Sequence, residues 1–225
     1  MKKNPDFIPA AESAWFIKVF DFYVRNLFWR RFHRVWYHQE YYPDAKSKTI
    51  YYLNHNSWWD GLIPLLLNQR IFRQKARAMM EDKQMQRHKF FKKIGAFSVN
   101  LEDPKGVITS LRYAVDSMKR PNASLFIYPE GKIVPFSVNR PSFKKGLGWI
   151  VSKCPDADVV PIGVFMHTAV SDKTELFLGI GSPVLVRHDS DNNAMNHQLE
   201  SELSKLLGKL QTGAFNNRNG FQRLI

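Results

Sequence analysis

Long uncharged apolar segments and cysteines are scarce in this sequence of 225 residues. No run of about 18 uncharged apolar residues occurs, so we expect no membrane-spanning helix. The single cysteine, Cys154, excludes an internal disulfide, and its place before an apolar strand favours a packing role over a nucleophilic one. The opening residues, MKKNPDFIPAAES, have no continuous apolar core, so we do not expect a secretory signal peptide.

Acidic side chains are also few. The sequence has 20 Asp and Glu residues and 33 Lys and Arg residues, which gives a net charge of +13. Such a surface attracts anionic lipid, nucleic acid or an acidic partner protein, and it also favours simple solubility. The hydrophobic share of 44% and the charged share of 24% are those of an ordinary globular protein. The length suits a single domain, and we find no internal repeat or low-complexity linker.

Residues 12–38 mix many aromatic rings with cationic side chains. Two polar stripes at helical spacing run through this segment, Lys18, Asp21 and Arg25 in the first and Arg30, Arg31 and Arg34 in the second. The stripes point in different directions, which predicts two short helices with a break near Asn26. Rings and cations on one helix suit a bilayer interface. We therefore predict amphipathic interfacial helices within residues 1–40 that anchor the protein to the membrane, the alternative being a terminal helix packed on the core.

The remaining residues, 41–225, alternate strand-like and helix-like segments. The strands are expected at 48–53, 96–101, 124–128, 159–165 and 176–186, the last as a strand pair or one bent strand. The helices are expected at 104–119, where Asp103 is the N-cap and Pro104 the first helical residue, and at 194–210. This alternation predicts a single-domain α/β fold with a mixed sheet flanked by helices.

The strand at 48–53 leads directly into Asn54-His55-Asn56-Ser57-Trp58-Trp59-Asp60. On one continuous helix His55 and Asp60 would lie about 140° apart and would not meet. They meet if His55 stays in the loop and Ser57 caps a helix whose first turn carries Asp60. An imidazole oriented by a carboxylate acts as a general base. The same residues also fit a purely structural capping box, or a metal site for which two ligands are too few.

Two further segments stand at strand ends. Tyr128-Pro129-Glu130-Gly131 closes the strand at 124–128 with a tight turn that presents a carboxylate, as functional strand ends of α/β sheets do. The alternative is an ordinary Pro-Gly turn. Val160-Pro161-Ile162-Gly163, taken alone, indicates only a buried strand interrupted by proline.

Taken in order, these segments resemble the glycerolipid (lysophosphatidic acid) acyltransferase family over about residues 51–165. The family's blocks and their matches here are the His-x4-Asp (HX4D) motif, His55 and Asp60; a Gly-led strand, Gly95-Ala96-Phe97-Ser98-Val99-Asn100; Pro-Glu-Gly, Pro129-Glu130-Gly131; and an apolar strand with proline, Val160-Pro161-Ile162-Gly163. Phe143-Lys144-Lys145-Gly146 also resembles a Lys-Gly segment of the family. Four ordered blocks are far more specific than one.

The resemblance implies a lipid O-acyltransferase of phospholipid biosynthesis. His55, held by Asp60 and supported by Asn54, Ser57 and Pro161, would take the proton from a lipid hydroxyl, whose oxygen attacks an acyl thioester. No cofactor is expected beyond the co-substrate, acyl-CoA or acyl carrier protein, and the acidic carrier protein suits a basic surface. We expect a peripheral or monotopic protein on the cytoplasmic face of an anionic membrane, with no bound metal and no nucleic-acid partner.

The acceptor site departs from the family pattern at two places. Glu130 and Gly131 match, but Leu101 stands where the second block usually ends in Arg, and Lys132-Ile133 stands where the third continues Thr-Arg. The basic residues that could replace this phosphate clamp as point charges are Lys132, Arg140, Lys144 and Lys145. Alternatively the acceptor has no phosphate and is a glycosylated, amino- or hydroxy-lipid. We favour the phosphate-bearing acceptor slightly.

Two rival functions remain open at this stage. A lipid esterase would use the same His–Asp pair and release free fatty acid without an acceptor. A nucleic-acid-binding module would use the aromatic and cationic residues of 12–38 to stack on bases. The density of those rings and the absence of any recognised nucleic-acid motif from the sequence favour the lipid function.

Overall fold

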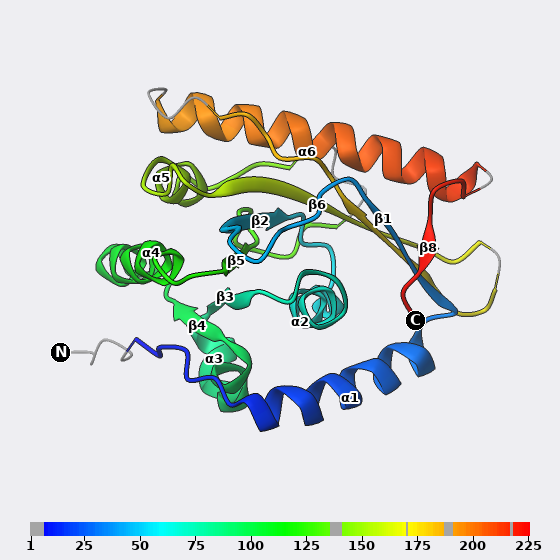
Figure 1. Cartoon of the computed structure of the whole chain (residues 1–225), viewed down its shortest axis with the longest axis horizontal. Helices are drawn as coiled ribbons and strands as arrows, with labels where there is room; N and C mark the ends of the chain where they lie inside the picture. The colour runs from blue at the N-terminus through cyan, green and yellow to red at the C-terminus, as the bar shows by residue number, and fades with distance from the viewer. Residues whose placement is uncertain (1–6, 136–140, 170, 187–190, 217) are drawn as a thin grey trace.

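The computed structural model describes all residues except 1–6, 136–140, 170, 187–190 and 217. The described residues form one mixed sheet with helices on both faces (Figure 1). The sheet order is β4-β3-β5-β2-β6-β7-β1-β8. The bounds are β1 Arg34–Gln39, β2 Thr49–Leu53, β3 Lys75–Glu81, β4 Ala96–Val99, β5 Ala123–Ile127, β6 Asp158–His167, β7 Glu175–Ile180 and β8 Gln222–Arg223. The predicted single-domain α/β fold is therefore confirmed.

The helices divide between the two faces of the sheet (Figure 1). On one face lie α1 (Ala14–Arg31), the short α2 (Ile63–Leu67), the 3-10 helix η1 (Trp58–Leu62) and the π-helical turn η2 (Asn68–Phe72). On the other face lie α4 (Pro104–Met118), α5 (Gly146–Ser152) and α6 (Asn192–Phe215). Two further short helices, α3 (Asp82–Arg87) and the 3-10 helix η3 (Lys89–Ile94), lie near the β4 edge of the sheet. The long α6 packs along β6 and β7.

β2 occupies the centre of the sheet and is the strand that carries the candidate site. It pairs in parallel with β5 on one side and β6 on the other, and β3 and β4 continue the parallel set. All five of its residues are buried, which explains its continuous run TIYYL rather than an alternating pattern. Because the five parallel strands end at the same edge, the residues that follow β2, β3 and β5 meet there.

The predicted elements agree with the structure in most places. α4 begins at Pro104, and Asp103 caps it by accepting hydrogen bonds from the backbone N–H groups of Lys105 and Gly106. The strands at 48–53, 96–101, 124–128 and 159–165 correspond to β2, β4, β5 and β6 within two or three residues. The strand predicted at 176–186 is shorter in the structure, because β7 ends at Ile180. The helix predicted at 194–210 is longer in the structure, where it forms α6.

The prediction of two helices with a break near Asn26 is wrong. α1 runs continuously to Arg31, and the Asn26 side-chain amide donates to the Phe22 carbonyl oxygen one turn back, within the helix. Val24 and Phe28 are fully buried against the domain on either side of Asn26, so packing holds the helix straight through it. Arg34 lies in β1 instead of a second helix, and β1 is part of the sheet. No helix among the described residues has the length and apolarity needed to traverse a bilayer.

Candidate active site

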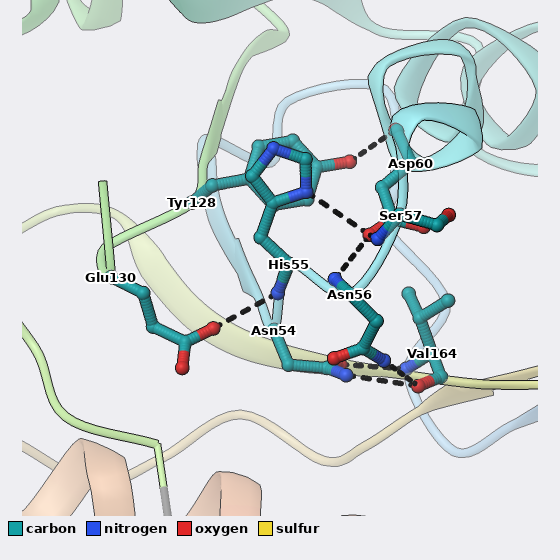
Figure 2. A network of polar contacts seen from close by, with 8 residues as sticks. All are labelled: Asn54, His55, Asn56, Ser57, Asp60, Tyr128, Glu130 and Val164. Atoms are coloured by element: carbon teal, nitrogen blue, oxygen red, sulfur yellow. Dashed lines mark hydrogen bonds and ion pairs between the residues drawn. The ribbon is translucent and has the colours of Figure 1, made fainter. Parts of the chain in front are cut away.

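The Asp60 carboxylate organises the loop that follows β2 (Figure 2). Its Oδ2 atom contacts His55 Nδ1 at 3.0 Å and accepts hydrogen bonds from the backbone N–H of Asn56 at 2.6 Å and of Ser57 at 2.8 Å. Its Oδ1 atom accepts from the Ser57 hydroxyl at 2.8 Å. Asp60 is completely buried in η1. The residues therefore meet as the sequence predicts, with His55 in the loop and Asp60 in the first helical turn.

The geometry of Asp60 is compatible with both the capping and the catalytic interpretation. The same carboxylate that receives the Ser57 N–H as a helix cap also fixes the His55 ring. An ionised carboxylate can only accept hydrogen bonds, so His55 Nδ1 is the donor to Asp60, and in the neutral imidazole Nε2 then presents the lone pair. The imidazole is thereby held in the tautomer that a general base requires.

Tyr128, which follows β5 directly and precedes the Pro-Glu-Gly turn, supports this arrangement. Its ring lies 4.6 Å from the His55 ring, centroid to centroid, and its hydroxyl donates to the backbone carbonyl oxygen of Asp60 (Figure 2). Burial, and to a lesser extent the nearby Asp60 charge, raise the pKa of Tyr128 well above its usual range. Tyr128 therefore stays protonated as a donor. The sequence alone assigned no role to Tyr128.

Glu130 lies beside the loop and contacts its backbone. Its Oε2 atom accepts a hydrogen bond from the His55 backbone N–H at 3.0 Å, and the side chain is buried (Figure 2). Burial raises the pKa of Glu130, while the hydrogen bond from His55 acts in the opposite direction. The structure thus places Glu130 where it fixes the position of His55. The role in acceptor binding stays a prediction.

Two asparagines tie the loop to β6. The Asn54 side chain forms two hydrogen bonds with the Val164 backbone. Asn54 Oδ1 accepts from the Val164 N–H at 2.8 Å, and Asn54 Nδ2 donates to the Val164 carbonyl oxygen at 2.9 Å. Asn56 Nδ2 donates to the same carbonyl at 3.0 Å. The backbone pairing of β2 with β6 ends at Leu53 and Ile162, so the Asn54 amide continues the ladder after the backbone turns away. Asn54 was predicted as a supporting residue, whereas Asn56 was not.

A cavity of about 340 Å³ adjoins His55. Most of its lining is apolar, with side chains from β3, η3, β4, α4 and α5 that include Met79, Met80, Phe91, Val99, Leu111 and Ile150. Trp58, Lys132 and Lys144 also line it. Leu101 is among the lining residues as well, so an apolar side chain stands at the position where the family usually has arginine. His88 and Glu81 are further polar residues of the lining. The cavity therefore joins a largely apolar interior to the His55 imidazole and two lysines.

Gly131 allows Lys144 to reach the site. Its φ of 65° lies in the left-handed region that favours glycine, and a Cβ atom there would come within 2.9 Å of Lys144 Cε. The Lys144 backbone N–H donates to the Pro129 carbonyl oxygen at 2.9 Å, which fixes this lysine over the turn. The structure thus brings Gly131, Lys132 and Lys144 together around the cavity.

Other predicted residues lie elsewhere. Pro161 is inside β6, in register with Tyr52 of β2, and does not line the cavity. Lys145 precedes α5 and is not a lining residue either. Arg140 lies outside the described residues. Within the described part of the chain, no group of three or more His, Cys, Asp or Glu side chains is arranged to hold a metal ion.

Comparisons with known proteins agree on the fold and on the family. A family model described as "Acyltransferase" matches residues 34–165. The crystal structure of the 1-acyl-sn-glycerophosphate (LPA) acyltransferase PlsC from Thermotoga maritima is similar, with a TM-score of 0.63 and 20% identity. The similarity covers 87% of this chain and 79% of that one, and at this identity it shows the fold. The comparison with curated protein sequences gave no match.

Removal of the hydrogen bonds between the loop and β6 should measurably lower the stability of the protein. Replacing Asn54 by Ala leaves the buried Val164 N–H without its partner, so Asn54→Ala should lower the free energy of unfolding by about 1–3 kcal/mol. Asn26→Ala is the matched control, because this exposed amide bonds only within α1, and its effect should stay within about 0.5 kcal/mol. Urea denaturation followed by circular dichroism measures both. Equal effects of the two substitutions would contradict the proposed tie.

Proposed function

This chain belongs to the acyltransferase family and is an acyltransferase, and we propose that it transfers a fatty acyl group from acyl-CoA or acyl carrier protein to a hydroxyl of a lysophospholipid or a related polar lipid. The observation that carries this proposal is the His55–Asp60 pair at the wall of an apolar cavity. The pair supplies a base, and the cavity supplies a place for a hydrocarbon chain. Both lie at the carboxyl edge of the parallel strands, where α/β sheets place their ligands.

The proposed reaction begins with the acceptor hydroxyl next to His55 Nε2. The imidazole takes the hydroxyl proton while the oxygen attacks the thioester carbonyl carbon, and Asp60 stabilises the imidazolium that forms. The tetrahedral intermediate then collapses, the C–S bond breaks, and the leaving thiolate takes the proton back from the imidazolium. The products are the new ester and the free thiol of the donor. Since the enzyme forms no covalent intermediate, this route requires no nucleophilic Ser or Cys.

The apolar lining supports a fatty acyl chain as the transferred group. Burying an alkyl chain against side chains such as Met79, Val99 and Leu111 is favourable by about 0.8 kcal/mol per methylene. A short or polar acyl group would leave much of this apolar surface uncovered. The same apolar surroundings limit water near the imidazole, which favours transfer to a lipid hydroxyl over hydrolysis.

The two lysines support an acceptor with an anionic head. Lys132 and Lys144 line the same cavity as His55, from two separate segments, and can hold phosphate as point charges. They stand in for the arginines that the family pattern would place here. A glycosylated or amino-lipid acceptor is the alternative, and it would make little use of these two charges.

Substitution of His55 tests the proposed base. His55→Ala should reduce acyl transfer by about 10²–10⁴-fold, the usual contribution of a general base, while circular dichroism shows an unchanged fold. The assay incubates the protein with labelled acyl donor and a total lipid extract and identifies the labelled product by mass spectrometry. A labelled lipid ester that depends on His55 supports the proposal. Labelled free fatty acid as the only product would show an esterase instead.

Substitution of Lys132 and Lys144 tests the proposed acceptor head. If it carries phosphate, Lys132→Ala and Lys144→Ala should each raise the acceptor KM by about tenfold, because a hydrogen bond to a charged group contributes about 1.5–3 kcal/mol. kcat and the donor KM should change little. Lys145→Ala is the matched control, since this neighbouring lysine does not line the cavity. An acceptor KM unchanged by both substitutions would identify a neutral head group.

We also propose that α1 docks on the membrane surface. Its buried side, with Val24 and Phe28, packs on the domain. Its outer side carries large exposed side chains at helical spacing, Trp15, Val19, Phe22, Tyr23 and Trp29. Lys18 and Arg25 are also exposed on this helix and can reach anionic head groups. An exposed aromatic face with flanking cations is typical of helices that lie in the interface.

Vesicle sedimentation tests this docking. The triple substitution Trp15→Ala, Phe22→Ala, Trp29→Ala should weaken binding to anionic phosphatidylglycerol vesicles by at least about tenfold, because each buried ring contributes one or more kcal/mol. Tyr42→Ala and Phe215→Ala remove exposed rings outside α1 and serve as controls. If the controls reduce binding as much as the triple variant, α1 is not the docking element.

A further inference from the structure

A second cavity, of about 380 Å³, lies on the face of β3 that α1 and α2 cover. Its apolar part is formed by Ile17 of α1, Leu65 of α2, Ala76 and Ala78 of β3, Ile94 of η3 and Phe126 of β5. None of these side chains takes part in the hydrogen bonds that hold the His55 loop. The proposed acyl transfer gives this cavity no role.

Positive charge gathers at the end of this cavity remote from His55. Lys75, Arg77 and Arg120 are lining residues, and Glu12 is the acidic lining residue. Lys75 and Arg77 lie in the first half of β3, whereas the His55 site lies beyond the carboxyl ends of the parallel strands. Arg120 follows α4 and donates from Nη2 to the Lys75 carbonyl oxygen at 2.9 Å, so it belongs to the same end.

Arg77 is a buried cation that retains an unpaired hydrogen-bond donor among the described residues. Its side chain is only 10% exposed, and its Nε finds no hydrogen-bond partner among the residues that the structure describes. Burial and then the nearby Arg120 guanidinium lower the pKa of Arg77, which means that this site disfavours two adjacent cations. An anion beside both guanidiniums relieves that repulsion, and in this structure the Glu12 carboxylate is that anion.

Glu12 shows which anion this end of the cavity accepts. One oxygen of its carboxylate forms ion pairs with Arg77 and, at 3.4 Å, with Arg120. The side chain is 31% exposed and precedes α1, so it reaches the cavity from the rim. A carboxylate is one of the groups that match the planar fork of guanidinium donors.

We propose that this second cavity binds a long-chain fatty acid, with its carboxylate at Arg77 and Arg120 in exchange for Glu12 and its alkyl chain along the apolar face of β3. The chain would lie under α1, which is the helix that we propose to rest on the bilayer. Gly61, Pro64, Ala78, Met80 and Phe91 line both cavities, so the fatty acid would press on a wall of the acyl-transfer cavity. The site is separate from the acceptor site and does not rest on the acyl-transfer mechanism.

Binding of oleate to the full chain tests this inference, measured by displacement of the fluorescent fatty acid cis-parinaric acid. Arg120→Gln removes one cation of the head site, and Ala76→Phe fills the apolar part. Each should weaken oleate binding by at least about tenfold, or about 1.4 kcal/mol. Lys119→Gln is the matched control, since this adjacent lysine is exposed and pairs with Asp116. Oleyl alcohol should bind the unaltered protein about tenfold more weakly than oleate.

Two further variants separate this site from the acyl-transfer cavity. His55→Ala should bind oleate as the unaltered protein does, even if the proposed transferase activity fails. Leu111→Trp narrows the acyl-transfer cavity alone and should also leave oleate binding in place. Oleate affinity that survives both Arg120→Gln and Ala76→Phe, or that is lost in Leu111→Trp, would overturn the inference. Circular dichroism checks that each variant is folded, and Arg120→Lys, which keeps the charge, should restore part of the affinity lost in Arg120→Gln.

Discussion

The buried carboxylate of Asp60 is the interaction on which the rest of the site depends. A charge without solvent must be matched by donors, and Asp60 receives them from the His55 ring, two backbone N–H groups and the Ser57 hydroxyl. These bonds close the loop between β2 and η1 and set the tautomer of His55 at the same time. A purely structural cap would not need the imidazole, and a purely catalytic pair would not need the backbone donors. The one carboxylate makes both sets of contacts, so folding of the loop and orientation of the His55 ring cannot be separated.

The strands on either side of β2 supply the remaining constraints, with two loop residues held from β6 and two contacts made from the turn after β5. β6 holds Asn54 and Asn56 through Val164, and the turn after β5 provides Glu130 to the His55 backbone and Tyr128 to the Asp60 backbone. A parallel sheet makes this possible because its strand ends converge on one edge although they are far apart in sequence. His55 is thus fixed by its ring, its backbone and its neighbours, which is the preorganisation that general-base catalysis requires.

Sequence predicted the local parts of this site and missed the distant ones. The meeting of His55 with Asp60 followed from a spacing of five residues and a strand-to-helix turn, and both can be judged within one short segment. The contact of Glu130 with the His55 N–H joins residues 75 apart, and no local rule places it. β3 was not predicted because its sequence KARAMME has no β-branched residue and little regular alternation. The prediction of a break in α1 was wrong for a related reason. Tertiary packing of Val24 and Phe28 outweighs the change in polar pattern at Asn26.

The contact between α1 and the catalytic loop bears on how the enzyme would meet its lipid substrates. Trp59 follows the loop directly, and its ring packs edge-on against Phe28 of α1 and Phe32 just after it, at 5.8 and 5.5 Å between centroids. Its neighbour Trp58 is exposed and lines the cavity beside His55. A helix that rested on the bilayer would therefore be joined to η1, which carries Asp60, through one cluster of packed rings rather than through a linker. The height of the His55 loop above the membrane would then be set by this packing.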